Sequence, residues 1–138
     1  MSLAADLATT AHYADHGSQW AYRSRGGGLR GADDLAATLD AFTDDAPAIL
    51  LAHEPDIFPG VPDRVAVTLS GHTHGGQVRI RGYSPLVPSR FGNRYAYGAI
   101  EEEGRHLVVS GGIGNSMLPV RFGMPPEVTM VELGGAGA

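Results

Sequence analysis

The sequence predicts an α/β domain in which one short helix precedes about five strands, so that the chain is mostly strand after residue 45. Three observations support this prediction. Leu35, Leu39 and Phe42 recur at helical spacing behind two aspartates suited to a helix start. The runs "AILLA" and "VAVTL" have the length and composition of buried strands. Clusters of Gly, Pro and Ser separate the segments that follow.

The first elements can be placed in chain order. Residues 1–28 show weak periodicity and end in "RSRGGG", so we expect a weakly patterned segment there and assign residues 29–138 to the domain. After the helix, "AILLAHEPD" predicts a buried strand that stops at His53, with Pro55 ending regular structure. The segment "RVAVTLSGHTHGGQVRI" predicts a strand that breaks at Gly71 and resumes after the glycine pair.

The last third of the chain is predicted to be a loop, a hairpin and a strand. The Pro-, Gly- and Ser-rich stretch "YSPLVPSRFGNRYAYG" suits a long surface loop. "YGAIEEEGRHLVVSGGIG" indicates a hairpin that turns at Glu103 and Gly104, and "EVTMVEL" indicates a final strand before a frayed tail.

Composition excludes several classes of function. The 138 residues suffice for one domain or a piece of a larger one, and 43% hydrophobic residues with 18% charged ones are typical of a globular chain. A net charge of -5 without a Lys/Arg cluster argues against binding a nucleic-acid backbone. No segment resembles a membrane span or a signal peptide, so we expect a soluble cytoplasmic chain. Cysteine is absent, so any metal must be held by nitrogen and oxygen ligands.

Three of the six histidines point to a metal site. His72 and His74 stand two apart in "LSGHTHGGQ", and in an extended backbone their side chains would point the same way with Cα atoms about 6.5 Å apart. They could then share one ion or bind two ions about 3.5 to 4 Å apart. His53 ends a neighbouring predicted strand and could converge on the same place. Imidazole suits Mn, Fe, Zn and Ni alike.

Other interpretations of the histidines stay open at this level. We expect no function for His12, His16 and His106, because isolated surface histidines usually have none. A cupin-type barrel would need a glutamate shortly after the H-x-H pair, where this chain has Gln77 and Val78. A mononuclear site of three histidines, like that of carbonic anhydrase, is compatible with the spacing.

Taken together, "LLAHEPDIF" and "LSGHTHGGQVRI" resemble the C-terminal half of the calcineurin-like metallophosphoesterases, in particular the bacterial phosphodiesterases that carry an "HTHGGQ" block. The resemblance continues through "VPSRFGNRYAYG" and "VVSGGIGNSMLPVRFGMPPEV" and covers roughly residues 29 to 133. It implies the C-terminal part of a four-layer α/β sandwich with two divalent ions at the ends of its strands. It also implies that His53 and His72 bind the second ion, that His74 binds the first, and that the substrate is a phosphoester.

The same resemblance exposes what this chain lacks. The family completes its site with D-x-H, G-D and G-N-H-D blocks from an N-terminal half, and none of them occurs here. The "ADHG" stretch has neither the Gly-Asn before it nor the Asp after it, so it is no substitute. The residue that assists the leaving group is therefore unknown, and we expect a fragment whose N-terminal half is missing, with membrane association open through such a segment. A non-catalytic remnant or metal-binding module is the alternative.

Several other residues are weaker candidates. Asn115 and Arg121 could line the phosphate side of the pocket or simply hold a loop. Glu54 and Asp56 could orient His53 or be exposed turn residues. The loop that carries Arg90, Arg94, Tyr95 and Tyr97 could contact an anionic or aromatic group of a substrate, although structural packing is the favoured role for the two tyrosines.

Overall fold

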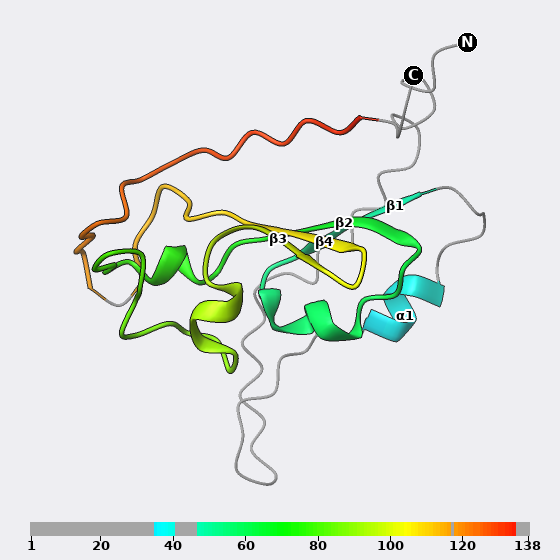
Figure 1. Ribbon diagram of the computed structural model, residues 1–138, viewed down its shortest axis with the longest axis horizontal. Helices are drawn as coiled ribbons and strands as arrows, with labels where there is room; N and C mark the ends of the chain where they lie inside the picture. The colour runs from blue at the N-terminus through cyan, green and yellow to red at the C-terminus, as the bar shows by residue number, and fades with distance from the viewer. Residues whose placement is uncertain (1–34, 41–46, 117, 135–138) are drawn as a thin grey trace, which may run out of the picture.

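The computed structural model describes residues 35–40, 47–116 and 118–134. Its centre is a four-stranded mixed sheet with the order β1-β2-β4-β3 (Figure 1). The strands are β1 (Ala48–Ala52), β2 (Val65–Ser70), β3 (Gly98–Glu102) and β4 (Arg105–Val109). β1, β2 and β4 run parallel, and β3 pairs antiparallel with β4. The carboxyl ends of the parallel strands therefore meet at one edge of the sheet.

One face of the sheet is covered by short helices, as Figure 1 shows. The helices on that face are α1 (Leu35–Asp40) and the 3₁₀ helices η2 (Pro55–Gly60) and η4 (Gly92–Tyr95), while η3 (His74–Gly76) lies beyond the carboxyl ends of the parallel strands. α1 confirms the expected helix, although Asp33, Asp34 and Phe42 lie outside the described residues. None of the helices in the described ranges is long and apolar enough to cross a membrane.

The core lies between the sheet and these helices. Alternate residues of each strand face it, as period-2 alternation requires, and the rings of Phe58 and Tyr95 meet edge to face with centroids 5.7 Å apart. Leu35 and Leu39 pack against this cluster, which confirms the apolar face predicted for the helix. The fully buried cluster consists of Ala48, Leu50, Phe58, Val61, Val65, Tyr95, Leu107 and Val109.

The predicted hairpin is confirmed. β3 and β4 pair from Gly98 with Val109 to Glu102 with Arg105, and Glu103 and Gly104 form the turn. Both turn residues have positive φ, 54° and 78°, which is the backbone of a type I′ turn.

Two predicted stretches of strand, the resumption after Gly76 and residues 127–133, are wrong, and the described residues hold four strands. After Gly76 the chain forms only isolated bridges, from Val78 to Phe122 and from Ile80 to Tyr83. Residues 127–133 form no strand, because they run across a face of the sheet, where no free strand edge is available for pairing (Figure 1). Pro55 does not end regular structure but opens η2, where its missing N–H is not needed.

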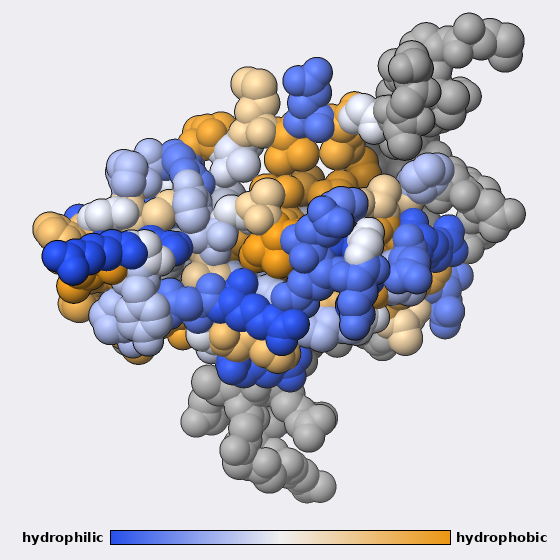
Figure 2. Space-filling view, in the orientation of Figure 1, coloured by the Kyte–Doolittle hydropathy of each residue, from blue (hydrophilic) through white to orange (hydrophobic). Residues whose placement is uncertain are grey.

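The second face of the sheet is apolar and incompletely covered. Leu51, Leu69 and Val108 lie in register across β1, β2 and β4, on the side opposite Leu50 and Leu107. Leu51 is 36% exposed, and Figure 2 shows apolar residues gathered on the surface of the molecule. The C-terminal segment, defined here as residues 127–134, crosses this side in an extended conformation.

Candidate metal centre

The candidate site lies at the carboxyl ends of the parallel strands. His53 directly follows β1, and His72 stands two residues beyond the end of β2. A hydrogen bond of 3.2 Å from the Gly71 N–H to the His53 carbonyl holds the two chain segments together past the strand ends. The sequence prediction that two neighbouring strands deliver histidines to one edge is therefore confirmed.

One ring nitrogen of His53 lies close to one ring nitrogen of His72. The distance between His53 Nε2 and His72 Nδ1 is 3.1 Å, with the rings inclined at 63° and their centroids 4.8 Å apart. Two nitrogens that each bind one ion at about 2.1 Å are separated by about 3.0 Å at a right angle and about 3.4 Å at the tetrahedral angle. This donor pair therefore fits a shared divalent ion. In the absence of metal the same distance suits a hydrogen bond between the rings.

The other nitrogen of His72 faces a carboxylate. Glu54 Oε1 lies 3.9 Å from His72 Nε2, so the acidic residue expected beside His53 is paired with His72 instead. At this distance the two groups share no hydrogen bond, so Glu54 acts on the ring through its charge alone. Asp56 serves the loop, because it accepts hydrogen bonds from the Ser89 hydroxyl at 2.5 Å and the Arg90 N–H at 2.9 Å.

The H-x-H pair is not extended, contrary to the prediction. His72 and His74 have φ values of 63° and 49°, the left-handed region that residues other than glycine seldom adopt. The turn is fixed by the buried Thr73, whose hydroxyl donates to the Ala96 carbonyl at 2.7 Å. It also requires Gly76, because a Cβ there would lie 2.3 Å from Ser84 Oγ. The histidines therefore reach the edge through a tight turn rather than through strand alternation.

Both histidines of the turn favour the neutral imidazole, the form that binds metal. Burial lowers the pKa of His72, and this effect outweighs the opposing charge of Glu54. Burial also lowers the pKa of His74, with a further decrease from the positive charge of Arg121, whose Nη2 lies 3.5 Å from His74 Nδ1. Arg121 was expected either to line the phosphate side or to hold a loop, and its hydrogen bonds to the carbonyls of Gly111, Gly114, Met124 and Pro125 hold the loop around His74.

The last residue of the block was not predicted to have a role. Gln77 donates from Nε2 to the carbonyls of Leu118 and Val120, both at 3.2 Å, and its Oε1 accepts a hydrogen bond from the Ser116 N–H. Both ends of the amide are used, so Gln77 fastens the loop that carries Arg121. A sequence pattern gives no sign of this, because the partners are about forty residues away.

Several of the weaker candidates make contacts that hold the fold together. Tyr95 is buried in the core, which confirms the packing interpretation, and Arg94 pairs with Glu102 at 2.8 Å. Arg90 contacts Asp56, and the hydroxyl of Tyr97 donates to Glu127 at 2.6 Å. Of the remaining candidates, Asn115 and His106 are exposed, while His12 and His16 fall outside the described residues.

The set of ligands is incomplete in this part of the chain. Among residues 35–40, 47–116 and 118–134, no group of three or more His, Asp, Glu or Cys side chains is placed to hold one ion together. The geometry therefore offers a pair of imidazoles, with His74 nearby, and lacks the carboxylates that usually neutralise a divalent ion.

Comparison with known proteins identifies the relatives of this chain. It is 38% identical over 106 residues to the uncharacterized metallophosphoesterase YkuE of Bacillus subtilis, an alignment that covers 76% of this chain and 37% of the relative. It is 39% identical over 92 residues to the phosphodiesterase YaeI of Escherichia coli, covering 63% of this chain and 32% of the relative. The chain belongs with the metallophosphoesterases.

The chain spans about a third of the length of the curated proteins that it matches. This coverage is consistent with similarity to one half of their domain. A bovine relative, named transmembrane protein with metallophosphoesterase domain, is 34% identical over 75% of this chain. No protein-family model matches the chain, and no solved structure matches it significantly. The relatives from Bacillus subtilis and Aquifex aeolicus are both named uncharacterized metallophosphoesterases.

Proposed function

We propose that residues 29–138 are the C-terminal portion of a metallophosphoesterase domain and supply His53, His72 and His74 to a centre of two divalent ions. The observation that supports this most directly is the 3.1 Å separation of His53 Nε2 and His72 Nδ1 at the ends of adjacent parallel strands. On this proposal the sheet described above is half of a four-layer α/β sandwich, and the substrate is a phosphodiester or phosphomonoester.

The residues of this chain have separate tasks in the proposed reaction. His53 and His72 would share one ion, and His74 would serve the other. When bound, such ions supply an acidified water and neutralise charge on the phosphoryl oxygens. Glu54 would lie on the opposite side of the His72 ring from the ion, with its carboxylate 3.9 Å from Nε2. The lowered pKa values of His72 and His74 keep both rings unprotonated and ready to bind near neutral pH.

Charge balance predicts that this chain alone binds two divalent ions poorly and therefore hydrolyses phosphoesters poorly. Three neutral imidazoles compensate none of the charge of two divalent ions, and the described residues bring no carboxylate bridge to them. We therefore expect weak metal binding and little or no hydrolysis by the isolated chain.

Metal stoichiometry tests the proposal. The purified chain is loaded with manganese or zinc and analysed for bound metal, alongside His53→Ala, His72→Ala and His74→Ala, with His106→Ala as the control on an exposed strand position. We expect weak binding that the first three substitutions reduce and the control leaves unchanged. Binding that none of the three affects would refute the assigned ligands. Two tightly held ions would refute the expectation that the isolated chain binds metal weakly. One tightly held ion would support a mononuclear site instead.

A further inference from the structure

The turn that carries His74 is held by side chains from the segment that follows it. Gly75 and Gly76 are buried and have positive φ, 63° and 81°. The Gly75 carbonyl accepts a hydrogen bond from Arg79 Nη1 at 3.3 Å, and the Gly76 carbonyl accepts one from Ser84 Oγ at 3.0 Å. The two glycines that follow His74 are therefore tied to the loop that runs towards β3.

Ser84 lies directly against Gly76. Its side chain is buried, and its one hydroxyl hydrogen lies between the carbonyls of Gly76 and Leu86, which are 3.0 and 2.8 Å from the hydroxyl oxygen. A Cβ added to Gly76 would overlap both side-chain atoms of Ser84. The serine therefore fills the space beside the glycine and limits the movement of the turn on that side.

Asn93 fixes Ser84 through both of its backbone groups. The Asn93 Oδ1 accepts a hydrogen bond from the Ser84 N–H at 2.9 Å, and Nδ2 donates to the Ser84 carbonyl at 2.7 Å. One side-chain amide thus pairs with one residue as a neighbouring strand would. Asn93 lies in η4, whose last residue, Tyr95, is buried in the core. The position of Ser84 is therefore set by a helix that is anchored in the core.

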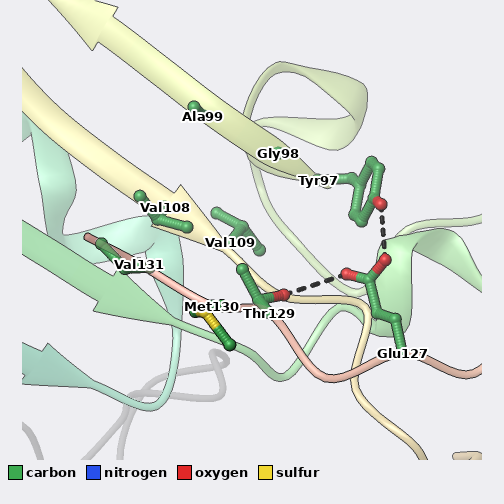
Figure 3. Close-up of a pocket in the computed structure, with 9 residues that line it drawn as sticks. All are labelled: Tyr97, Gly98, Ala99, Val108, Val109, Glu127, Thr129, Met130 and Val131. Atoms are coloured by element: carbon green, nitrogen blue, oxygen red, sulfur yellow. Dashed lines mark hydrogen bonds between the residues drawn. The ribbon is translucent and has the colours of Figure 1, made fainter.

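The other end of the loop is anchored just before β3, as Figure 3 shows. The hydroxyl of Tyr97 donates to Glu127 Oε2 at 2.6 Å, and Glu127 Oε1 accepts from the Gly111 N–H at 2.9 Å. The carbonyl of Gly111 accepts from Arg121 Nη2 at 2.6 Å, and the same nitrogen lies 3.5 Å from His74 Nδ1. The loop therefore ends at a chain of contacts that returns to the side of His74.

His74 depends on the loop for its backbone conformation. Its φ of 49° lies in the left-handed region, which is unfavourable for a residue with a Cβ. The Thr73 hydroxyl holds the turn on the side of His72, and Ser84 holds it on the side of Gly76. Loss of the Ser84 contact would therefore release the part of the turn that carries His74 and leave the part that carries His72.

We propose that Ser84 and Asn93 are positioning residues: Asn93 fixes Ser84, and Ser84 holds the Gly76 carbonyl so that the turn presents His74 to an ion. The inference rests on the proposed function for the identity of His74 as a ligand. It deepens that function, because it gives a part in metal binding to two residues of a stretch that was expected to be only a surface loop.

The first test needs no metal. Scalar couplings in magnetic resonance spectra of the metal-free chain report the φ angle of each residue. We expect positive φ at both His72 and His74 in the unaltered chain. In Ser84→Ala and Asn93→Ala we expect the couplings of His74 to move towards those of a residue that samples several conformations, while the couplings of His72 stay the same. Couplings of His74 that change in neither alanine variant would overturn the proposal.

A matched variant separates this effect from a general loosening of the loop. The Ser89 hydroxyl anchors the same loop to Asp56, at 2.5 Å, instead of to the turn. Ser89→Ala removes a hydrogen bond of the same kind, so we expect it to leave the couplings of His74 unchanged. A change in Ser89→Ala as large as in Ser84→Ala would contradict the proposal.

The second test measures zinc affinity by calorimetry in a double-mutant cycle. We expect Ser84→Ala and Asn93→Ala to weaken binding about 10- to 100-fold, and Ser89→Ala to leave it unchanged. Because Ser84 acts through His74, Ser84→Ala should have no further effect in a chain that already carries His74→Ala. A residue that merely supports the fold would weaken binding in both backgrounds.

The outcomes of the cycle distinguish this inference from the proposed function. If Ser84→Ala weakens binding equally with and without His74, or does not weaken it at all, the positioning role is refuted while the proposed function stands. If His74→Ala leaves zinc binding unchanged, the assignment of His74 as a ligand is refuted and the inference fails with it. If the unaltered chain binds no zinc, the proposed ligands are refuted, and the couplings alone decide whether Ser84 and Asn93 fix the turn.

Discussion

His72 and His74 occupy a backbone conformation that costs free energy. A residue with a Cβ in the left-handed region is destabilised by roughly 1 to 2 kcal/mol relative to the ordinary helical region. Gln77 also has a positive φ, 50°, with a ψ of -43° that lies outside the left-handed helical region, so three residues of one short block have an unfavourable backbone conformation. Such strain collects at sites where the direction of a side chain matters more than stability. The strain here is what aims the His72 ring at His53.

Substitution at position 72 measures this cost. We expect His72→Gly to be more stable than His72→Ala by about 1 kcal/mol, because both variants lack the ring and only glycine adopts a φ of 63° freely. The same pair at Thr73, whose φ is -70°, is the control and should give the opposite order. Urea unfolding provides the free energies. Equal stability of the two variants at position 72 would contradict the strain.

The sequence identified some site residues and missed others for physical reasons. His53 and His72 were predictable because each follows an apolar run, and parallel strands bring their ends together. The bend between His72 and His74 was not predictable from strand alternation, since it depends on the contact of Thr73 with Ala96. Arg121 lies 47 residues from His74, so only the folded chain shows that they meet.

At the scale of elements, the β3–β4 turn allows a prediction. Both central residues of a type I′ turn have positive φ, which Asn-Gly satisfies better than Glu-Gly. Glu103 also pairs with Arg105 at 2.6 Å, an exposed contact whose contribution must be separated from the backbone term. We expect Glu103→Asn to be more stable than Glu103→Ala by up to about 1 kcal/mol, since both variants lose that pair. Thermal and urea unfolding test the difference, and a more stable alanine variant would contradict it.

The correctly predicted elements are those whose own sequence determines how they pair in the sheet. β1 and β2 are apolar runs that must be buried, and β3 and β4 are joined by a turn that sets their register. The alternation in "EVTMVEL" is equally regular, yet residues 127–133 form no strand. A periodic pattern shows that a segment has two different faces, but it does not supply a free strand edge for it to pair with.

At the scale of the whole molecule, the described chain leaves apolar groups open to solvent. Leu51 on edge strand β1 is 36% exposed, and in the C-terminal segment Val128 and Met130 are 87% and 94% exposed. Apolar side chains left exposed on the open face of a sheet are expected where another layer packs. This agrees with a chain that spans about a third of its curated relatives.

We therefore expect the 138-residue chain to associate with itself in solution. Gel filtration should give an apparent mass above the 14.4 kDa of one chain, and the excess should grow with protein concentration. Leu51→Lys and Met130→Lys should lower the apparent mass by placing charge on the exposed face, whereas Ala36→Lys, at an exposed position on α1, should not. A single monomeric peak at every concentration would contradict this expectation.

Glu127 connects the C-terminal segment with the surroundings of His74. It begins the segment that crosses the open face of the sheet, and it holds the peptide beside His74. A molecule that docks on that face and moves the segment would therefore change the affinity of an ion for His74. Thermodynamic reciprocity then requires the ion to change the affinity of the docking molecule by the same factor. On the proposed function, docking on that face and the binding of an ion by His74 would therefore be thermodynamically coupled.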